Sequence, residues 1–178
     1  MKVLSIYLVW YLSAVVSASS QTPAPPITSP NLSAIAFLTK HEWAAKLPDT
    51  PDGKPREIHA RFTWSQSGHA IRITNQFVID GRTRPYLEGL YAWDPQQRVI
   101  AFWYVDADGS LTKGKVTTDG GKLIHEFDQV TPDGKSSSYV AKVTQYGEQA
   151  WDNEIFERHG AELKLMVKVR YEVVDSSP

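Results

Sequence analysis

The feature that most constrains this chain is a period-two alternation of apolar and polar residues along most of its length. In REIHARFTW, the residues Ile58, Ala60, Phe62 and Trp64 are apolar and the residues between them are polar. Such alternation predicts strands with one face turned to a core. Turn signals rich in glycine, aspartate and proline separate the segments, so we expect about ten strands joined by short loops, the first around residues 43–47.

Sequential hairpins of this kind predict an all-β fold, an antiparallel up-and-down meander without crossover helices. An open sheet of about ten strands would expose two edges, so we expect the meander to close into a barrel. A barrel of more than about eight strands usually encloses a cavity. The sequence thus predicts a single β-barrel domain over residues 31–175, with a short N-terminal helix.

Two turns can be used to predict strand register. A Ser67-Gly68 turn keeps the core apolar, because it pairs Trp64 with Ile71, Phe62 with Ile73 and Ala60 with Asn75. At Asp80-Gly81 we expect a three-residue turn, since a two-residue turn would set Arg84 against Phe77. This register pairs Ile73 with Leu87 and turns four residues inward, namely Leu87, Gly89, Tyr91 and Trp93.

The first 18 residues have the pattern of a secretory signal peptide, with one lysine, an apolar run and then small residues. The apolar run is about 14 residues long, short of the roughly 20 that span a bilayer. Residues 19–30 are rich in serine, threonine and proline, which is typical of a solvated linker. We expect the protein to be secreted or periplasmic, with no membrane attachment once the signal is removed.

The net charge and the cysteine content limit which binding partners and which kinds of chemistry the chain can have. Cleavage after Ala18, or after Ser20 as a second choice, removes Lys2 and no acid, so 18 basic and 20 acidic residues remain and the net charge is −2. This balance gives no attraction to nucleic acid or to an anionic membrane. The chain has no cysteine, which excludes disulfides, thiol chemistry and cysteine-ligated metals. The sequence does not indicate an oligomeric state.

One helix is expected before the first strand, over residues 29–38, with Ser29 as its cap and Pro30 at its first position. Its apolar side comprises Leu32, Ile35, Ala36 and Leu38. The strand at 99–105 is apolar on both faces, so something must cover its outer side. We predict that the helix docks on the barrel, either over the outer side of Ile100 and Phe102 or as a plug at one end.

The order of these segments resembles a known family. The short helix is followed by HEWAAKL, FTWSQSGHAIRI, EGLYAWDPQQRVIAFWYVDADGSLTKGKV and DGGKLIHEF, and the chain ends in a strand with VRYE. Over about residues 32–174 this resembles secreted bacterial domains of unknown function that have a calycin-like (lipocalin-like) barrel. The shared marks are structural, so the resemblance implies the barrel fold and brings no catalytic residue with it.

The haem-binding nitrobindins are a more distant resemblance. They have a glycine-flanked tryptophan on the first strand and a histidine near the last. Here Trp43 is flanked by Glu42 and Ala44, and His159 matches by position alone. Haem is therefore a minority hypothesis, and on the leading hypothesis no cofactor is predicted.

Motifs that would mark a metal site or a catalytic nucleophile are incomplete. In the DADG segment at 106–109 the glycine comes two places too early for an EF-hand loop, and the glutamate expected at its twelfth position is missing, so the segment is expected to form a hairpin turn. The HEWAA segment at 41–45 lacks the second histidine of a zinc-protease helix. The five histidines have no ligand spacing, and the nucleophile elbow, phosphate loop and dinucleotide fingerprint are absent. We predict no metal site.

Inward parity selects five candidate cavity residues: Trp64, Asn75, Tyr91, Trp93 and His125. Aromatic walls with a few polar groups are the usual form of a small-molecule site. The leading hypothesis is therefore an exported barrel that binds a small apolar or amphipathic ligand. One alternative is an enzyme of the cyclase, isomerase or hydratase type with a buried His125 as base. The other is a haem-binding barrel that uses His125 or His159.

Overall fold

The computed structural model describes residues 28–174 and contains one short helix and ten strands. The predicted signal peptide (1–18) and most of the predicted linker (19–30) lie outside these residues. The elements in chain order are η1 (Pro30–Lys40), β1 (Glu42–Leu47), β2 (Arg56–Trp64), β3 (Ala70–Ile79), β4 (Arg82–Asp94), β5 (Val99–Asp106), β6 (Leu111–Asp119), β7 (Lys122–Val130), β8 (Ser136–Tyr146), β9 (Ala150–His159) and β10 (Glu162–Val173).

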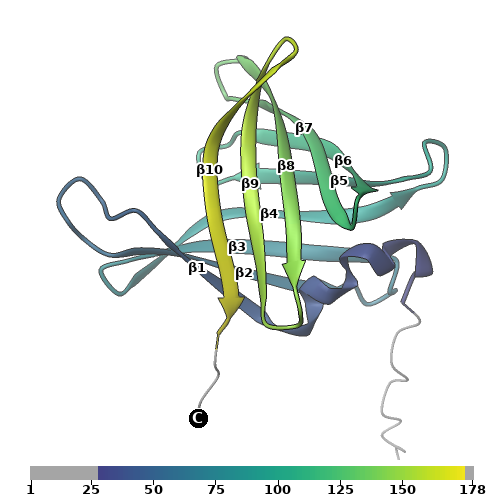
Figure 1. Ribbon diagram of the computed structural model, residues 1–178, viewed down its shortest axis with the longest axis horizontal. Helices are drawn as coiled ribbons and strands as arrows, with labels where there is room; N and C mark the ends of the chain where they lie inside the picture. Colours follow the sequence, from purple (N-terminus) through teal and green to yellow (C-terminus); the bar gives the residue numbers. More distant parts are fainter. Residues whose placement is uncertain (1–27, 175–178) are drawn as a thin grey trace, which may run out of the picture.

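The ten strands form a closed antiparallel barrel in which every strand pairs with its chain neighbours and β1 pairs with β10. This confirms the predicted meander and its closure. The seam between β1 and β10 is short, because it pairs Trp43 with Val173 and Ala44 with Glu172. In Figure 1, strands β8 to β10 cross in front of β2 to β5, and the β9–β10 hairpin extends beyond the rest of the barrel.

The two register predictions have different outcomes. The pairs Trp64–Ile71, Phe62–Ile73 and Ala60–Asn75 form as predicted. The three-residue turn predicted at Asp80-Gly81 is wrong: both residues have positive φ, as a two-residue turn requires, and Arg84 does lie opposite Phe77. A bulge at Tyr86 shifts the later pairs, so Ile73 lies opposite Gly89 rather than Leu87. Tyr91 nevertheless faces inward, because the two registers differ by an even number of residues.

The helix η1 is a 3₁₀-helix, and its apolar spacing suits that geometry. Leu32, Ile35 and Leu38 are three residues apart, which places them on one face of a helix with about three residues per turn. All three are buried, with 0%, 0% and 3% of their surface exposed. Pro30 occupies the first turn as predicted, whereas Ser29 precedes the helix without a capping hydrogen bond from its side chain.

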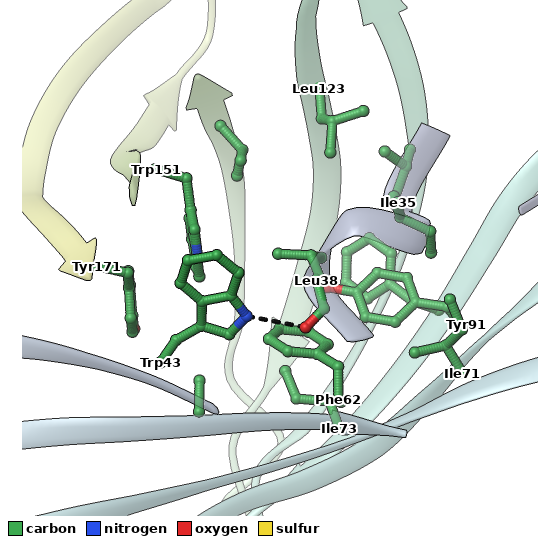
Figure 2. Packing of buried hydrophobic residues seen from close by; sticks show 14 of the residues in the cluster. Ile35, Leu38, Trp43, Phe62, Ile71, Ile73, Tyr91, Leu123, Trp151 and Tyr171 are labelled. Carbon is green, nitrogen blue, oxygen red and sulfur yellow. Dashed lines mark hydrogen bonds between the residues drawn. The ribbon is translucent and has the colours of Figure 1, made fainter. Parts of the chain in front are cut away.

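The helix closes one end of the barrel, which is the second of the two predicted arrangements. Figure 2 shows Leu38 between Trp43 and Tyr91, among inward-facing residues of several strands. The Trp43 indole Nε1 donates a 2.8 Å hydrogen bond to the Leu38 carbonyl. At the two ends of the helix, the Ser29 amide bonds the Gly68 carbonyl, and Lys40 forms a 2.6 Å ion pair with Glu148 of the β8–β9 turn.

The other predicted arrangement, with the helix over the outer side of Ile100 and Phe102, is wrong. Both residues face the interior and are buried. The outer face of β5 carries Trp103 and Val105, which are 46% and 47% exposed. The helix packs against the apolar end of the barrel and not against the outer face of β5. No helix within residues 28–174 has the length and apolarity needed to cross a membrane.

Candidate functional site: a barrel cavity

The barrel encloses a cavity of about 650 Å³. Leu38 of the helix forms part of its floor, and all ten strands contribute to its wall. At the opposite end of the barrel, Leu47, Pro48 and Arg56 line the cavity beside the β1–β2 loop, which lies on the left in Figure 1. Met166 of β10 also lines it and is half exposed. The cavity therefore opens to solvent at the end that the helix does not close.

The wall is largely aromatic. Phe102 lies at its centre, with ring centroids 4.8 Å from Tyr104, 5.4 Å from Tyr91 and 5.9 Å from Phe127. Gly114 makes this packing possible, since a Cβ there would lie 2.7 Å from the Phe102 ring and 2.6 Å from the Phe127 Cβ. Ring pairs of this kind prefer tilted or edge arrangements, which hold the rings in place. The result is a closely packed, mostly apolar surface.

A chain of hydrogen bonds crosses this aromatic wall. The Tyr104 hydroxyl donates to the Tyr91 hydroxyl. The Tyr91 hydroxyl oxygen in turn lies 3.4 Å from Nε2 of His125. Burial lowers the pKa of His125 to about 4, so the imidazole is neutral at pH 7. Burial also raises the pKa of both tyrosines, which keeps their hydroxyls protonated. If Tyr91 donates to Nε2, the proton of the neutral imidazole is on Nδ1.

Five buried side-chain atoms within residues 28–174 have no hydrogen-bond partner, and all five belong to residues of the cavity wall. They are Nε of Arg56, Oδ1 of Asn75, Nδ1 of His125, Nε1 of Trp151 and Oδ1 of Asn153. A buried polar atom without a partner costs about 1–3 kcal/mol, so native proteins rarely leave one unpaired. Because all five residues line the same cavity, we infer that the molecules filling this cavity, water or ligand, complete these hydrogen bonds.

Near the mouth, the carboxylate of Asp106 is half buried and accepts a 2.8 Å hydrogen bond from Gln129. Burial raises the Asp106 pKa to about 6, and the nearby charge of Asp108 adds to the rise. Asp108 itself belongs to the DADG segment, which forms the β5–β6 turn as predicted: its carboxylate accepts from the Ser110 amide. Gly109 bonds the Asp106 carbonyl across the same turn.

The five predicted cavity residues divide into two groups. Asn75, Tyr91 and His125 line the cavity. Trp64 and Trp93 face inward but pack into the core beside the helix end of the barrel, outside the cavity lining. Their strands end there, at the β2–β3 and β4–β5 turns.

His159 lies at the exposed β9–β10 turn, 3.0 Å from Glu157, and does not line the cavity. Haem ligation would thus depend on His125, whose Nε2 already faces Tyr91. Within residues 28–174 there is no group of three or more histidine, cysteine, aspartate or glutamate side chains that could hold a metal ion.

Sequence reasoning did not single out Arg56, Tyr104, Trp151 or Asn153, although parity contains a signal for each. Asn153 has the same parity as Ile155 in AWDNEIFE, and Arg56 has that of Ile58 in REIHARFTW. The rule that selected Asn75, a polar residue at an inward position, would have selected these two as well. Trp151 stacks on Tyr171, with ring centroids 4.0 Å apart, a pairing that depends on the β9–β10 register.

Comparison with known proteins assigns no family to this chain. No protein-family model matches it, and no curated protein matches it significantly. A solved structure described as EF1p2_mFAP2b bound to DFHBI is similar, with 12% sequence identity and a TM-score of 0.37. The alignment covers 79% of this chain and 97% of that chain. At this level of similarity, nothing about the site follows from the likeness.

Proposed function

We propose that this protein binds a small, mainly apolar ligand inside its barrel. The observation that carries the proposal is that all five unpartnered buried polar atoms of the described chain belong to the wall of one open cavity. A cavity of about 650 Å³ is within the usual range of small-molecule sites, roughly 300–1,000 Å³. The aromatic wall offers the ligand apolar contacts, and hydrogen bonds to the unpartnered polar atoms fix the ligand's orientation.

Export belongs to the same proposal. The signal-like segment at residues 1–18 supports a secreted or periplasmic binding protein, and the resemblance to secreted calycin-like domains agrees with it. A chain without cysteine can fold in an oxidising compartment on the strength of its core alone. Mass spectrometry of the secreted and periplasmic fractions would test this by locating the mature N-terminus near residue 19.

Ligand binding is tested with N-phenyl-1-naphthylamine, a neutral apolar dye that fluoresces when it leaves water. We expect saturable binding of one dye per chain. The variant Ala141→Phe should abolish it, because Ala141 lines the cavity and a larger side chain would occupy its volume. Ala92→Phe, on the outer face of β4, is the matched control and should bind normally. No saturable binding, or equal loss in the two variants with melting curves intact, would refute the proposal.

A second candidate, an enzyme with His125 as base, has one observation in its favour. The cavity reaches His125, and the Tyr91 hydroxyl lies 3.4 Å from its Nε2. A pKa of about 4 makes this imidazole a weak base at neutral pH, which favours binding over catalysis. Turnover of a bound compound that is abolished by His125→Gln, with binding retained, would establish the enzyme instead.

A further inference from the structure

The cavity also indicates a class of ligand, an inference that rests on the proposed binding function. We infer that it takes a planar aromatic molecule with an anionic group, and that Arg56 at the mouth holds the anion. Two independent features carry this inference: a cationic side chain without an anionic partner, and a wall built from aromatic rings.

Arg56 begins β2 and lines the cavity with a half-buried side chain. Its Nε is buried without a partner, and its guanidinium lies 6.0 Å from the Phe77 ring centroid. No ion pair to Arg56 occurs in the described part of the chain. A permanently charged, partly desolvated group of this kind is stabilised by an anion with two acceptor oxygens.

In the described part of the chain, none of the acids near the mouth forms an ion pair with Arg56. Asp52 and Asp80 lie 3.3 Å and 4.0 Å from Lys54, and Glu57 lies 3.2 Å from His59. Asp106 is the carboxylate in the cavity lining, and it accepts the hydrogen bond of Gln129. Among the charged side chains that line the cavity in residues 28–174, Lys168 pairs with Glu154 and Asp106 accepts from Gln129, which leaves Arg56 without a side-chain partner.

The wall next to Arg56 suits a flat ring. Phe77 and Tyr86 pack beside it in a tilted arrangement with centroids 4.3 Å apart, and Tyr86 is the bulged residue of β4. Farther along, Phe127 stacks on Tyr139 with centroids 5.3 Å apart. All four rings line the cavity. Aromatic faces gain more from an offset or edge contact with another ring than from an alkyl chain.

The experiment compares three small compounds by isothermal titration calorimetry. 1-Naphthoate carries the rings and the anion, 1-naphthamide carries the rings alone, and octanoate carries the anion on a chain of similar hydrophobicity. We expect 1-naphthoate to bind about 10- to 100-fold more tightly than 1-naphthamide, the range expected for a charge-assisted hydrogen bond. We expect it to bind at least about tenfold more tightly than octanoate, because only the naphthoate stacks.

Arg56→Gln should remove the preference for naphthoate over naphthamide and leave naphthamide binding unchanged. Arg72→Gln, an exposed arginine on the outer face of β3, is the control and should keep the preference. Equal affinity for naphthoate and naphthamide, or a preference that survives Arg56→Gln, would overturn the role of the anion. Equal affinity for octanoate and naphthoate would overturn the inference that the ligand is a planar aromatic molecule.

These failures can be distinguished from failure of the proposed function. If the neutral dye N-phenyl-1-naphthylamine binds in the cavity and naphthoate shows no preference, the ligand class is wrong and the binding function stands. If neither compound binds, both are wrong. Circular dichroism of Arg56→Gln confirms that the barrel is intact, and Arg56→Lys gives a second reading, since a point charge should restore only part of the preference.

Discussion

The end-capping helix offers the most quantitative test of how this fold is held together. Ile35 is completely buried against the barrel interior, in the same cluster as Leu32 and Leu38. Ile35→Ala removes three carbon atoms from this contact and leaves a cavity that the rigid aromatic core cannot easily fill. For such substitutions the cost is about 2–5 kcal/mol. We expect about 3 kcal/mol here, a large part of the roughly 5–15 kcal/mol that stabilises a domain.

The assay is equilibrium unfolding in urea followed by tryptophan fluorescence, with Ser33→Ala on the exposed face of the same helix as control. With a denaturant dependence of about 2 kcal/mol per M, the midpoint should fall by roughly 1–2 M. The melting temperature should fall by on the order of 6–12 °C. Ser33→Ala should stay within about 0.5 kcal/mol of the parent protein.

Equal midpoints for Ile35→Ala and Ser33→Ala would refute the reasoning, because a docked helix cannot lose a buried side chain without cost. A chain that begins at His41 extends the test. It should be less stable than the parent and should bind more apolar dye, since removal of Leu38 opens the second end of the cavity.

Three further predictions concern the cavity wall. His125 has a pKa of about 4 when folded and an ordinary value of 6.5, so stability should fall as pH drops from 6.5 towards 4, by up to about 3 kcal/mol. Asp106, with its pKa raised from 3.8 to about 6, acts in the opposite sense, so the slope is measured in Asp106→Asn. It should become much smaller when His125→Gln is added. Gly114→Ala should lower the free energy of unfolding by about 1–3 kcal/mol in thermal unfolding, because its Cβ would lie 2.4 Å from the Glu126 carbonyl oxygen. An unchanged stability would show that the wall can shift. Asn75→Leu should stabilise the ligand-free protein by about 1 kcal/mol, since Oδ1 has no partner, and a lower melting temperature would mean that it has one.

The alternation in REIHARFTW was sufficient to predict a strand and its inward face. Each face of a barrel strand meets a single environment, so the alternation of apolar and polar residues along the strand indicates which side is mainly buried. The same logic predicted the inward direction of Tyr91 and His125. The register after Asp80-Gly81 could not be predicted, because a bulge at Tyr86 shifts the strand pairing that the two-residue turn begins. The bulged Tyr86 packs against Phe77 of the neighbouring strand, a contact that exists only after folding.

Parity gives the direction of a side chain and not its position along the barrel axis. Trp64 and Trp93 point inward like Tyr91, yet they lie beside the helix end, where the interior is filled. Arg56 lies at the other end and lines open space. Which inward residues surround a cavity depends on strand stagger and on where the helix docks, and both are set by the whole chain rather than by a local pattern.

The central claim is that ligands enter the barrel, and the indole N–H resonances of the tryptophans test it directly. Trp151 lines the cavity with an Nε1 that lacks a partner, whereas Trp103 is on the outer face beside exposed apolar residues such as Val105. On titration with 1-naphthoate or N-phenyl-1-naphthylamine, followed by ¹⁵N–¹H NMR, the Trp151 indole resonance should shift and that of Trp103 should stay in place. A shift of the Trp103 resonance with no change at Trp151 would place the ligand on the outer surface and contradict the account.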